Sequence, residues 1–196
     1  MPCCWNSSDA PRRNERLVAG VPLKILGISG SLRTASSNSA VLRVAARVAP
    51  EGIAVHVYSG IEQLPYFNPD LDRAFDDPLL PQAVRELRAA IADADALLIS
   101  SPEYAHGVPG VLKNALDWLV GGPEMVGKRV ALLNTSPHAT YAQASLKETL
   151  RTMSVTLVSE ASLAIALPRG ASDDALVANG SIALALSIAM QALVAR

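Results

Sequence analysis

The chain has 196 residues, of which 50% are hydrophobic and 18% are charged. This length indicates one domain, and the composition excludes global disorder while leaving enough apolar surface for a core without metals or disulfides. Seventeen lysines and arginines against eighteen aspartates and glutamates give a formal net charge of −1, and aromatic residues make up only 4%. This balance disfavours nucleic-acid binding, which relies on a positive field and on stacking side chains.

Two end segments stand apart from the predicted domain. Residues 1–21 mix proline, polar and charged residues without periodicity, so we predict a flexible tail followed by one domain over residues 22–196. The tail carries Cys3 and Cys4, interpreted as free thiols in a reducing cytoplasm, and no apolar stretch typical of an export signal. The apolar segment from Ile182 to Ala195 is shorter than the roughly twenty residues that span a bilayer. We therefore expect a cytoplasmic protein with neither a membrane nor a nucleic-acid partner.

Apolar runs and helical periodicities alternate along the predicted domain. Short apolar runs, typical of strands buried on both faces, predict strands at 23–29, 53–58, 94–100 and 129–133, and a last strand at either 155–158 or 163–167. Helical spacing predicts helices that begin after Asn38 as N-cap, and at 82–92, 109–119, 142–153 and 181–194. In the helix at 82–92, the spacing turns Arg85, Glu86 and Arg88 toward solvent. Residues 64–81 read as a long surface connection.

Five strands that alternate with helices predict a doubly wound α/β domain. Its sheet is parallel with helices on both faces, because parallel neighbours need crossover connections. Sheets of this kind bind ligands beyond the carboxyl ends of their strands. We therefore expect the site among the loops at 29–38, 58–80, 100–110 and 134–142.

The loop after the first strand has the chemistry of a phosphate site. From Gly30 to Asn38 it holds five hydroxyl or amide side chains and one arginine, Arg33. Backbone N–H groups at the start of the following helix can surround a phosphate together with these hydroxyls and the guanidinium. The spacing differs from the glycine patterns of dinucleotide-binding and triphosphate-binding loops. An ordinary serine-rich turn capped by Asn38 remains the alternative.

Three motifs carry a resemblance to a known family. They are Gly30-Ser31-Leu32-Arg33 followed by Ser36 and Asn38, then Ser101-Pro102-Glu103-Tyr104, and then Pro109-Gly-Val-Leu-Lys-Asn-Ala-Leu-Asp-Trp118. Over roughly residues 22–168 the chain resembles the NADPH-dependent FMN reductase family of flavodoxin-like proteins. The resemblance implies a five-stranded sheet in the order 2-1-3-4-5, bound FMN, and a homodimer or homotetramer.

The resemblance also implies which residues hold the cofactor. In this family the loop after the third strand borders the isoalloxazine ring, and the loop after the fourth lies beside the flavin. Hydride chemistry at the flavin N5 requires no protein base, so we expect no catalytic side chain and interpret His106 as merely solvated. The residues expected to bind the cofactor are Ser31, Arg33, Ser36, Asn38, Pro102, Glu103, Tyr104 and Ser136.

Two departures from the family pattern affect the loop after the third strand. Family members commonly have asparagine directly after Pro-Glu-Tyr and serine two residues later, where this chain has Ala105 and Gly107. Loss of these side-chain contacts implies a roomier substrate pocket and weaker FMN binding. In the following helix, we interpret Lys113 and Asp117 as a structural i,i+4 pair and Trp118 as core or interface filling.

The loop after the fourth strand, residues 134–141, lacks the glycines that the family often has there. Ser136, His138 and Thr140 can offer donors to the flavin, with Gln143 on the next helix; alternatively, Thr140 or Ser136 only caps that helix. A metal site is disfavoured, because the three histidines lie on different predicted elements without ligand spacing.

The resemblance implies an NAD(P)H-dependent oxidoreductase in which hydride passes from NADPH or NADH to FMN and electrons then pass to a small-molecule acceptor. Free flavin, a quinone, an azo compound and chromate are the candidate acceptors. An FMN-binding electron carrier or redox sensor with little turnover is the alternative, although a net charge of −1 provides no strongly acidic docking face. A third hypothesis is a module that binds a different phosphate ester. Trp118 and the apolar final helix predict exposed hydrophobic surface, and hence a homo-oligomer.

Overall fold

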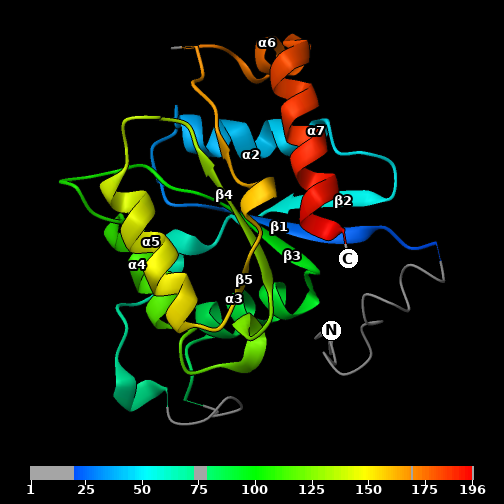
Figure 1. Cartoon of the computed structure of the whole chain (residues 1–196). Helices are drawn as coiled ribbons and strands as arrows, with labels where there is room; N and C mark the ends of the chain where they lie inside the picture. The colour runs from blue at the N-terminus through cyan, green and yellow to red at the C-terminus, as the bar shows by residue number, and fades with distance from the viewer. Residues whose placement is uncertain (1–19, 73–78, 169, 196) are drawn as a thin grey trace.

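The computed structural model describes residues 20–72, 79–168 and 170–195, so the predicted tail lies almost entirely outside the described residues. Figure 1 shows a central sheet with helices on both sides. The strands are β1 (Leu23–Ser29), β2 (Ile53–Val57), β3 (Ala96–Ser100), β4 (Arg129–Asn134), β5 (Thr156–Leu157) and β6 (Leu163–Ala164). The helices are α2 (Ser37–Arg47), α3 (Gln82–Asp93), α4 (Gly110–Asp117), α5 (Tyr141–Thr152), α6 (Asp173–Ala178) and α7 (Gly180–Val194). Short 3-10 helices are η2 (Ile61–Gln63), η3 (Pro69–Leu71), η4 (Pro123–Met125) and η5 (Ser159–Ala161).

All strand pairs of the sheet are parallel, in the predicted order β2-β1-β3-β4-β5. The edge differs from the expectation of five strands, because β6 also pairs with β4. The start of β4 pairs with β5, Arg129 facing Thr156, and its end pairs with β6, Leu133 facing Leu163. Both alternatives predicted for the last strand therefore form, each as a two-residue strand.

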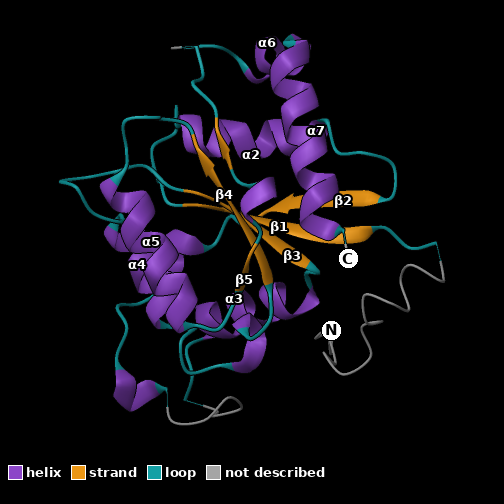
Figure 2. Cartoon of the chain, in the orientation of Figure 1, coloured by secondary structure: helices purple, strands orange, loops and turns teal. Residues whose placement is uncertain are grey.

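Alternation along each strand sends side chains to two separate cores. In β3, Leu97 and Ile99 join the core under α3, α4 and α5, whereas Ala96 and Leu98 join the core under α2, α6 and α7. Figure 2 shows these two groups of helices on opposite sides of the strands. Because successive side chains of a strand point to opposite faces, a sheet covered twice needs apolar residues at every position, which is the pattern seen in the sequence.

The first helix begins differently from the sequence prediction. Ser36, not Asn38, is the N-cap of α2, and its hydroxyl accepts a hydrogen bond from the Ser39 backbone N–H at 3.3 Å. Asn38 is a buried residue of the first turn. Both serine and asparagine are good N-caps, so residue type alone does not choose between positions two apart.

Arg88 of α3 is buried, with 3% of its side chain exposed, so its predicted solvent exposure is wrong. Its Nη2 donates to Asp72 Oδ1 at 2.8 Å and to the Trp118 carbonyl at 2.6 Å, and its Nε lies 3.3 Å from Glu124 Oε1. Burial raises the pKa of the Glu124 carboxyl, and the positive charge of Arg88 only partly opposes this shift. Arg88 thus joins η4 and the end of α4 to α3.

Trp118 is fully buried and fastens the long connection after β2 onto the core. Its indole N–H donates to the Pro65 carbonyl at 2.8 Å, and its ring meets Phe67 edge-on with centroids 5.1 Å apart. Lys113 and Asp117 form the predicted i,i+4 ion pair, at 2.5 Å. The structural interpretation of these residues is therefore confirmed.

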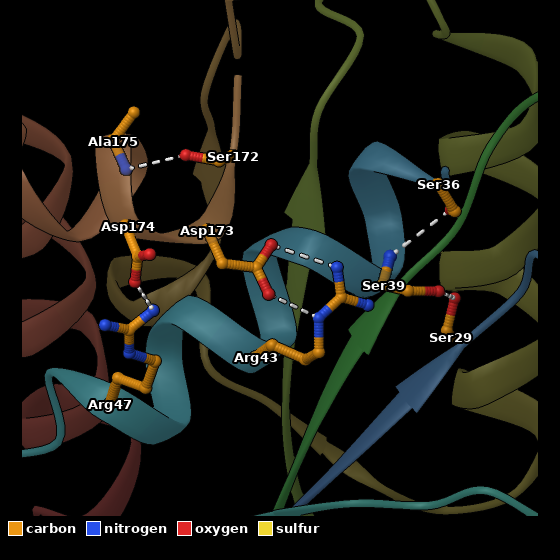
Figure 3. Close-up of polar contacts among 9 residues, drawn as sticks. All are labelled: Ser29, Ser36, Ser39, Arg43, Arg47, Ser172, Asp173, Asp174 and Ala175. Atoms are coloured by element: carbon orange, nitrogen blue, oxygen red, sulfur yellow. Dashed lines mark hydrogen bonds and ion pairs between the residues drawn. The ribbon is translucent and has the colours of Figure 1, made fainter. Parts of the chain in front are cut away.

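The short helix α6, which the sequence pattern did not predict, is tied to α2 by ion pairs (Figure 3). The Arg43 guanidinium donates to both carboxylate oxygens of Asp173, at 2.6 and 3.0 Å, and Arg47 pairs with Asp174 at 2.7 Å. Ser172 caps α6 by accepting from the Ala175 N–H. The hydrogen bond from Arg43 holds the pKa of the Asp173 carboxyl below its ordinary value.

Asp173→Asn is expected to lower the free energy of unfolding by less than about 1 kcal/mol at pH 7, because both side chains are partly exposed. Since the pKa of Asp173 is lower in the folded state, its stabilisation exists above the unfolded pKa of about 3.9 and is lost as the pH falls through the folded value. Urea denaturation from pH 7 to pH 2.5 measures this, with Asp174→Asn as the more exposed control. A deficit that stays constant over the whole range would contradict the assignment.

Among the described helices, none combines the length and apolarity needed to cross a bilayer.

Candidate functional site

Three loops meet at the carboxyl edge of the sheet. They follow β1, β3 and β4, and the first two are adjacent because the Gly30 N–H donates to the Ser100 carbonyl at 2.8 Å. After β1 the chain turns to β2 on one side, while β3 lies on the other, so the first two loops flank the point where strand order reverses. A Cβ at Gly30 would lie 3.2 Å from Ser101 Oγ and 3.4 Å from Pro102 Cδ. A larger residue at position 30 would crowd the Ser101 side chain, which would have to shift by a few tenths of an ångström.

In the loop after β1, which leads into α2, the charged and hydroxyl side chains divide between solvent and the interior. Arg33 and Thr34 are exposed, whereas Ser31 and Ser36 are buried. The Ser31 hydroxyl accepts from the Arg33 N–H at 3.4 Å, which shapes the turn, and Ser36 caps the helix. An exposed guanidinium beside the positive end of a helix dipole is suited to an anion such as a phosphate.

Asn38 links all three loops. Its Oδ1 accepts from Ser100 Oγ at 2.9 Å and from Thr135 Oγ1 at 3.3 Å, and only 6% of the residue is exposed. The resemblance implied a cofactor contact for this residue. Its side-chain oxygen lies within the protein, where it holds the start of α2 against the ends of β3 and β4, and the cofactor contact stays a prediction.

The loop after β3 contains a tight turn from Tyr104 to Gly107. The two residues exchange backbone hydrogen bonds of 3.2 and 2.9 Å, and the central residues Ala105 and His106 have φ of +48° and +60°. Positive φ at both central positions defines a type I′ turn, which favours asparagine and glycine. Non-glycine residues there cost about 1 kcal/mol or more each. Ala105, a departure from the family pattern, therefore occupies a position that asparagine would suit better.

Glu103 caps helix α5 from the neighbouring loop. Its Oε2 accepts from the Ala142 backbone N–H at 2.8 Å, in the first turn of that helix. The alternative of a cap from Thr140 or Ser136 does not form: the N-cap residue is Thr140, which has helical dihedral angles, and it makes no side-chain hydrogen bond to the helix. The resemblance implied a flavin contact for Glu103; its cap on α5 joins residues 39 positions apart and has no local signal in the sequence.

The same two segments meet again through a pair of stacked rings. His106 lies on Tyr141, the first residue of α5, with centroids 4.4 Å apart and planes inclined by 17°. His106 and Tyr141 are both exposed, Tyr141 to 60%, and Tyr104, which begins the turn that carries His106, is exposed to 55%. Sequence reasoning treated His106 as solvated and did not find this pair, because the contact joins residues 35 positions apart.

The loop after β4 is a polar turn held by the side chain of Asn134. Asn134 Oδ1 accepts from the Ser136 N–H at 2.9 Å, which leaves the Ser136 and His138 side chains exposed at the edge. Gln143 lies instead against a cavity of about 510 Å³ between α5 and the β4–β6 edge. Over residues 20–72, 79–168 and 170–195, no cluster of three or more histidine, cysteine, aspartate or glutamate side chains is placed to hold a metal ion.

The chemistry of this edge fits FMN. One end offers Arg33, Ser31 and the start of α2 to a phosphate, and the neighbouring turn at 102–104 offers backbone groups and an exposed tyrosine to a flat ring. The structure brings all eight residues predicted to bind the cofactor to this edge. Asn38 and Glu103 are engaged there in contacts that join one loop to another.

Comparisons with known proteins agree with this arrangement. A family model described as NADPH-dependent FMN reductase matches residues 23–168. An NAD(P)H-dependent FMN reductase of Pseudomonas aeruginosa is 41% identical over 133 residues, which cover 65% of this chain and 69% of that protein. A 2-hydroxy-1,4-benzoquinone reductase of Burkholderia is 36% identical over 144 residues, covering 70% and 75%. Among solved structures, a flavoenzyme NAD(P)H:(acceptor) oxidoreductase from Paracoccus denitrificans matches with a TM-score of 0.72 and 29% identity, over 87% of this chain and 95% of that one.

Proposed function

Because the chain belongs to the NADPH-dependent FMN reductase family, we propose that it is an NAD(P)H-dependent oxidoreductase that binds FMN and passes electrons to a small-molecule acceptor. One observation carries the proposal: the anion-binding loop after β1 and the turn after β3 are joined at one edge by the hydrogen bond from Gly30 to Ser100. A phosphate at the first loop therefore leaves its attached ring beside the second.

The protein's part in the reaction is binding and orientation. Arg33, Ser31 and the N–H groups of α2 would bind the phosphate, and the segment that begins at Pro102 would border the ring through its backbone and Tyr104. When bound, FMN supplies the atom that accepts and returns the hydride. Ser136 offers a hydroxyl from the third loop. Asn38 and Glu103 keep the three loops in register with one another.

A quinone or free flavin is the acceptor class that we favour. The names of the relatives in Burkholderia and Pseudomonas support a quinone and FMN respectively. Azo compounds and chromate are further candidates. An electron carrier or redox sensor with little turnover is the alternative function, and the formal net charge of −1 gives it no strongly acidic docking surface.

Steady-state oxidation of NADPH, and of NADH in parallel, by protein loaded with FMN tests the proposal. We expect sustained turnover that requires both FMN and a quinone and consumes one reductant per quinone reduced. Binding of FMN without turnover would favour the carrier. Failure of the protein to bind FMN would overturn the proposal in favour of a module for another phosphate ester.

We also propose that the protein is a cytoplasmic homo-oligomer. Cys3 and Cys4 support the location, because free thiols suit a reducing compartment. Leu184 and Ile188 support the assembly: they lie one turn apart on α7 and are 61% and 54% exposed. Trp118 is buried in the core and does not contribute. Light scattering at micromolar concentration is expected to give the mass of a dimer or tetramer, and the mass of one chain would contradict this.

A further inference from the structure

We propose that the stacked rings of His106 and Tyr141 form a docking platform for a planar aromatic acceptor, and that Glu103 positions this platform. The proposal rests on the proposed function. An acceptor must contact the flavin ring, and the ring is expected against residues 102–104. His106 belongs to the four-residue turn that begins at Tyr104, so it follows directly on the segment expected to border the ring.

The platform consists of two flat rings that remain open to solvent. The rings lie one over the other, with 17° between planes and 4.4 Å between centroids, so each ring supports the other and a planar acceptor would stack on an outer face of the pair. Both residues are exposed in spite of this contact. Aromatic rings that stack with an offset attract one another, so a planar quinone gains affinity at such a surface, while an acceptor without a flat ring does not.

The backbone holds His106 in this place at a cost. A histidine with φ of +60° is uncommon, and it persists only where the surroundings determine the conformation. The paired hydrogen bonds between Tyr104 and Gly107 supply one constraint, and the stack on Tyr141 supplies another. A residue that favours such a turn, such as glycine, would have no ring to present.

Glu103 supplies the third constraint, from the other side of the pair. Its carboxylate accepts a hydrogen bond from the N–H of Ala142. Glu103 lies just before the turn that carries His106, and Ala142 lies just after Tyr141. The two elements that carry the platform are thereby fixed to each other. Glu103 acts on the acceptor only through the two rings, which makes it a positioning residue.

The test compares a planar quinone with ferricyanide, an acceptor without an aromatic ring. For the FMN-loaded enzyme without reductant, we expect the Kd of 1,4-naphthoquinone to rise about two- to tenfold in His106→Ala and in Tyr141→Ala, from the usual strength of one ring contact. In turnover, the ratio of kcat/KM for the quinone to kcat/KM for ferricyanide is expected to fall by a similar factor, because the KM for the quinone rises. Tyr141→Phe and His106→Phe are the matched controls, because they keep a ring, and they should retain both values.

Glu103→Ala is expected to lower the same ratio, whereas Glu103→Gln keeps an oxygen that can accept from Ala142 and restores it. The platform would be overturned if His106→Ala and Tyr141→Ala both left the quinone Kd and the quinone-to-ferricyanide ratio of kcat/KM unchanged. Losses in the phenylalanine variants equal to those in the alanine variants would also overturn it. An unchanged ratio in Glu103→Ala would overturn its positioning role. These results differ from failure of the proposed function, in which the unmodified protein binds no FMN or oxidises no NADPH.

Discussion

Arg88→Met is expected to lower the free energy of unfolding by about 3–5 kcal/mol at pH 7, the usual effect of removing one partner from a buried ion pair. Glu124 and Asp72 are 1% and 10% exposed, and Arg88 is the cation paired with both. Methionine fills a similar volume but removes the guanidinium that pairs with both carboxylates, and the Trp118 carbonyl loses its donor. Urea denaturation followed by circular dichroism measures the loss.

Glu124→Gln separates the effect of charge from that of packing. Burial places the pKa of Glu124 in the folded state above its value in the unfolded state, so the ionised carboxylate opposes folding. Glu124 therefore stabilises the fold below its unfolded pKa of about 4.3, and this stabilisation is lost as the pH rises through the folded pKa. Glu124→Gln alone is therefore expected not to destabilise the protein at pH 7. Combined with Arg88→Met, it should recover about 0.5–3 kcal/mol of the loss. Strict additivity of the two substitutions would contradict this account.

Arg33→Ala is expected to raise the Kd for FMN about ten- to hundredfold, because a hydrogen bond to a charged group contributes about 1.5–3 kcal/mol. The side chain is exposed next to the start of α2, so its removal should leave the fold intact. Titration of FMN fluorescence measures the Kd. Arg33→Lys should lose less than the alanine variant, since it keeps the positive charge but not the planar donors.

Arg47→Ala is the matched control for Arg33. Arg47 is also an exposed arginine, but it lies at the C-terminal end of α2, away from the loop after β1, and it pairs with Asp174. Its removal is expected to leave the Kd for FMN within about twofold, since surface ion pairs contribute little and the phosphate loop is at the other end of the helix. Equal losses in the two variants would show that general positive charge, rather than the loop after β1, attracts the cofactor.

The parts of the fold that follow from local patterns were predictable. β3 is apolar at each of Ala96, Leu97, Leu98 and Ile99, which only a strand covered on both faces requires, and the alternation of such runs with helices fixes a parallel sheet. The meeting of the loops after β1 and β3 follows from that topology, because carboxyl ends of parallel strands share one edge. The neighbourhood of the site was therefore within reach of these patterns, whereas the strand order was implied only by the family resemblance.

Contacts between residues distant in sequence, in the core and at the site, were not predictable. Arg88 lies four residues after Val84, on the same face of α3, but its burial depends on carboxylates supplied by Asp72 and Glu124 from other segments. Glu103 finds its partner in α5, 39 residues away. Neither pairing has a local signature, whereas the helical and strand periods do.

Mixing the FMN-loaded protein with NADPH in the absence of oxygen tests the central claim most directly, namely that this edge of the sheet holds a flavin in reach of a reduced nicotinamide. The account predicts that the visible absorbance of the bound flavin is lost at one equivalent of NADPH and returns when a quinone is added. Protein that holds no flavin after gel filtration, or whose bound flavin keeps its visible absorbance with excess NADPH and NADH, would contradict it.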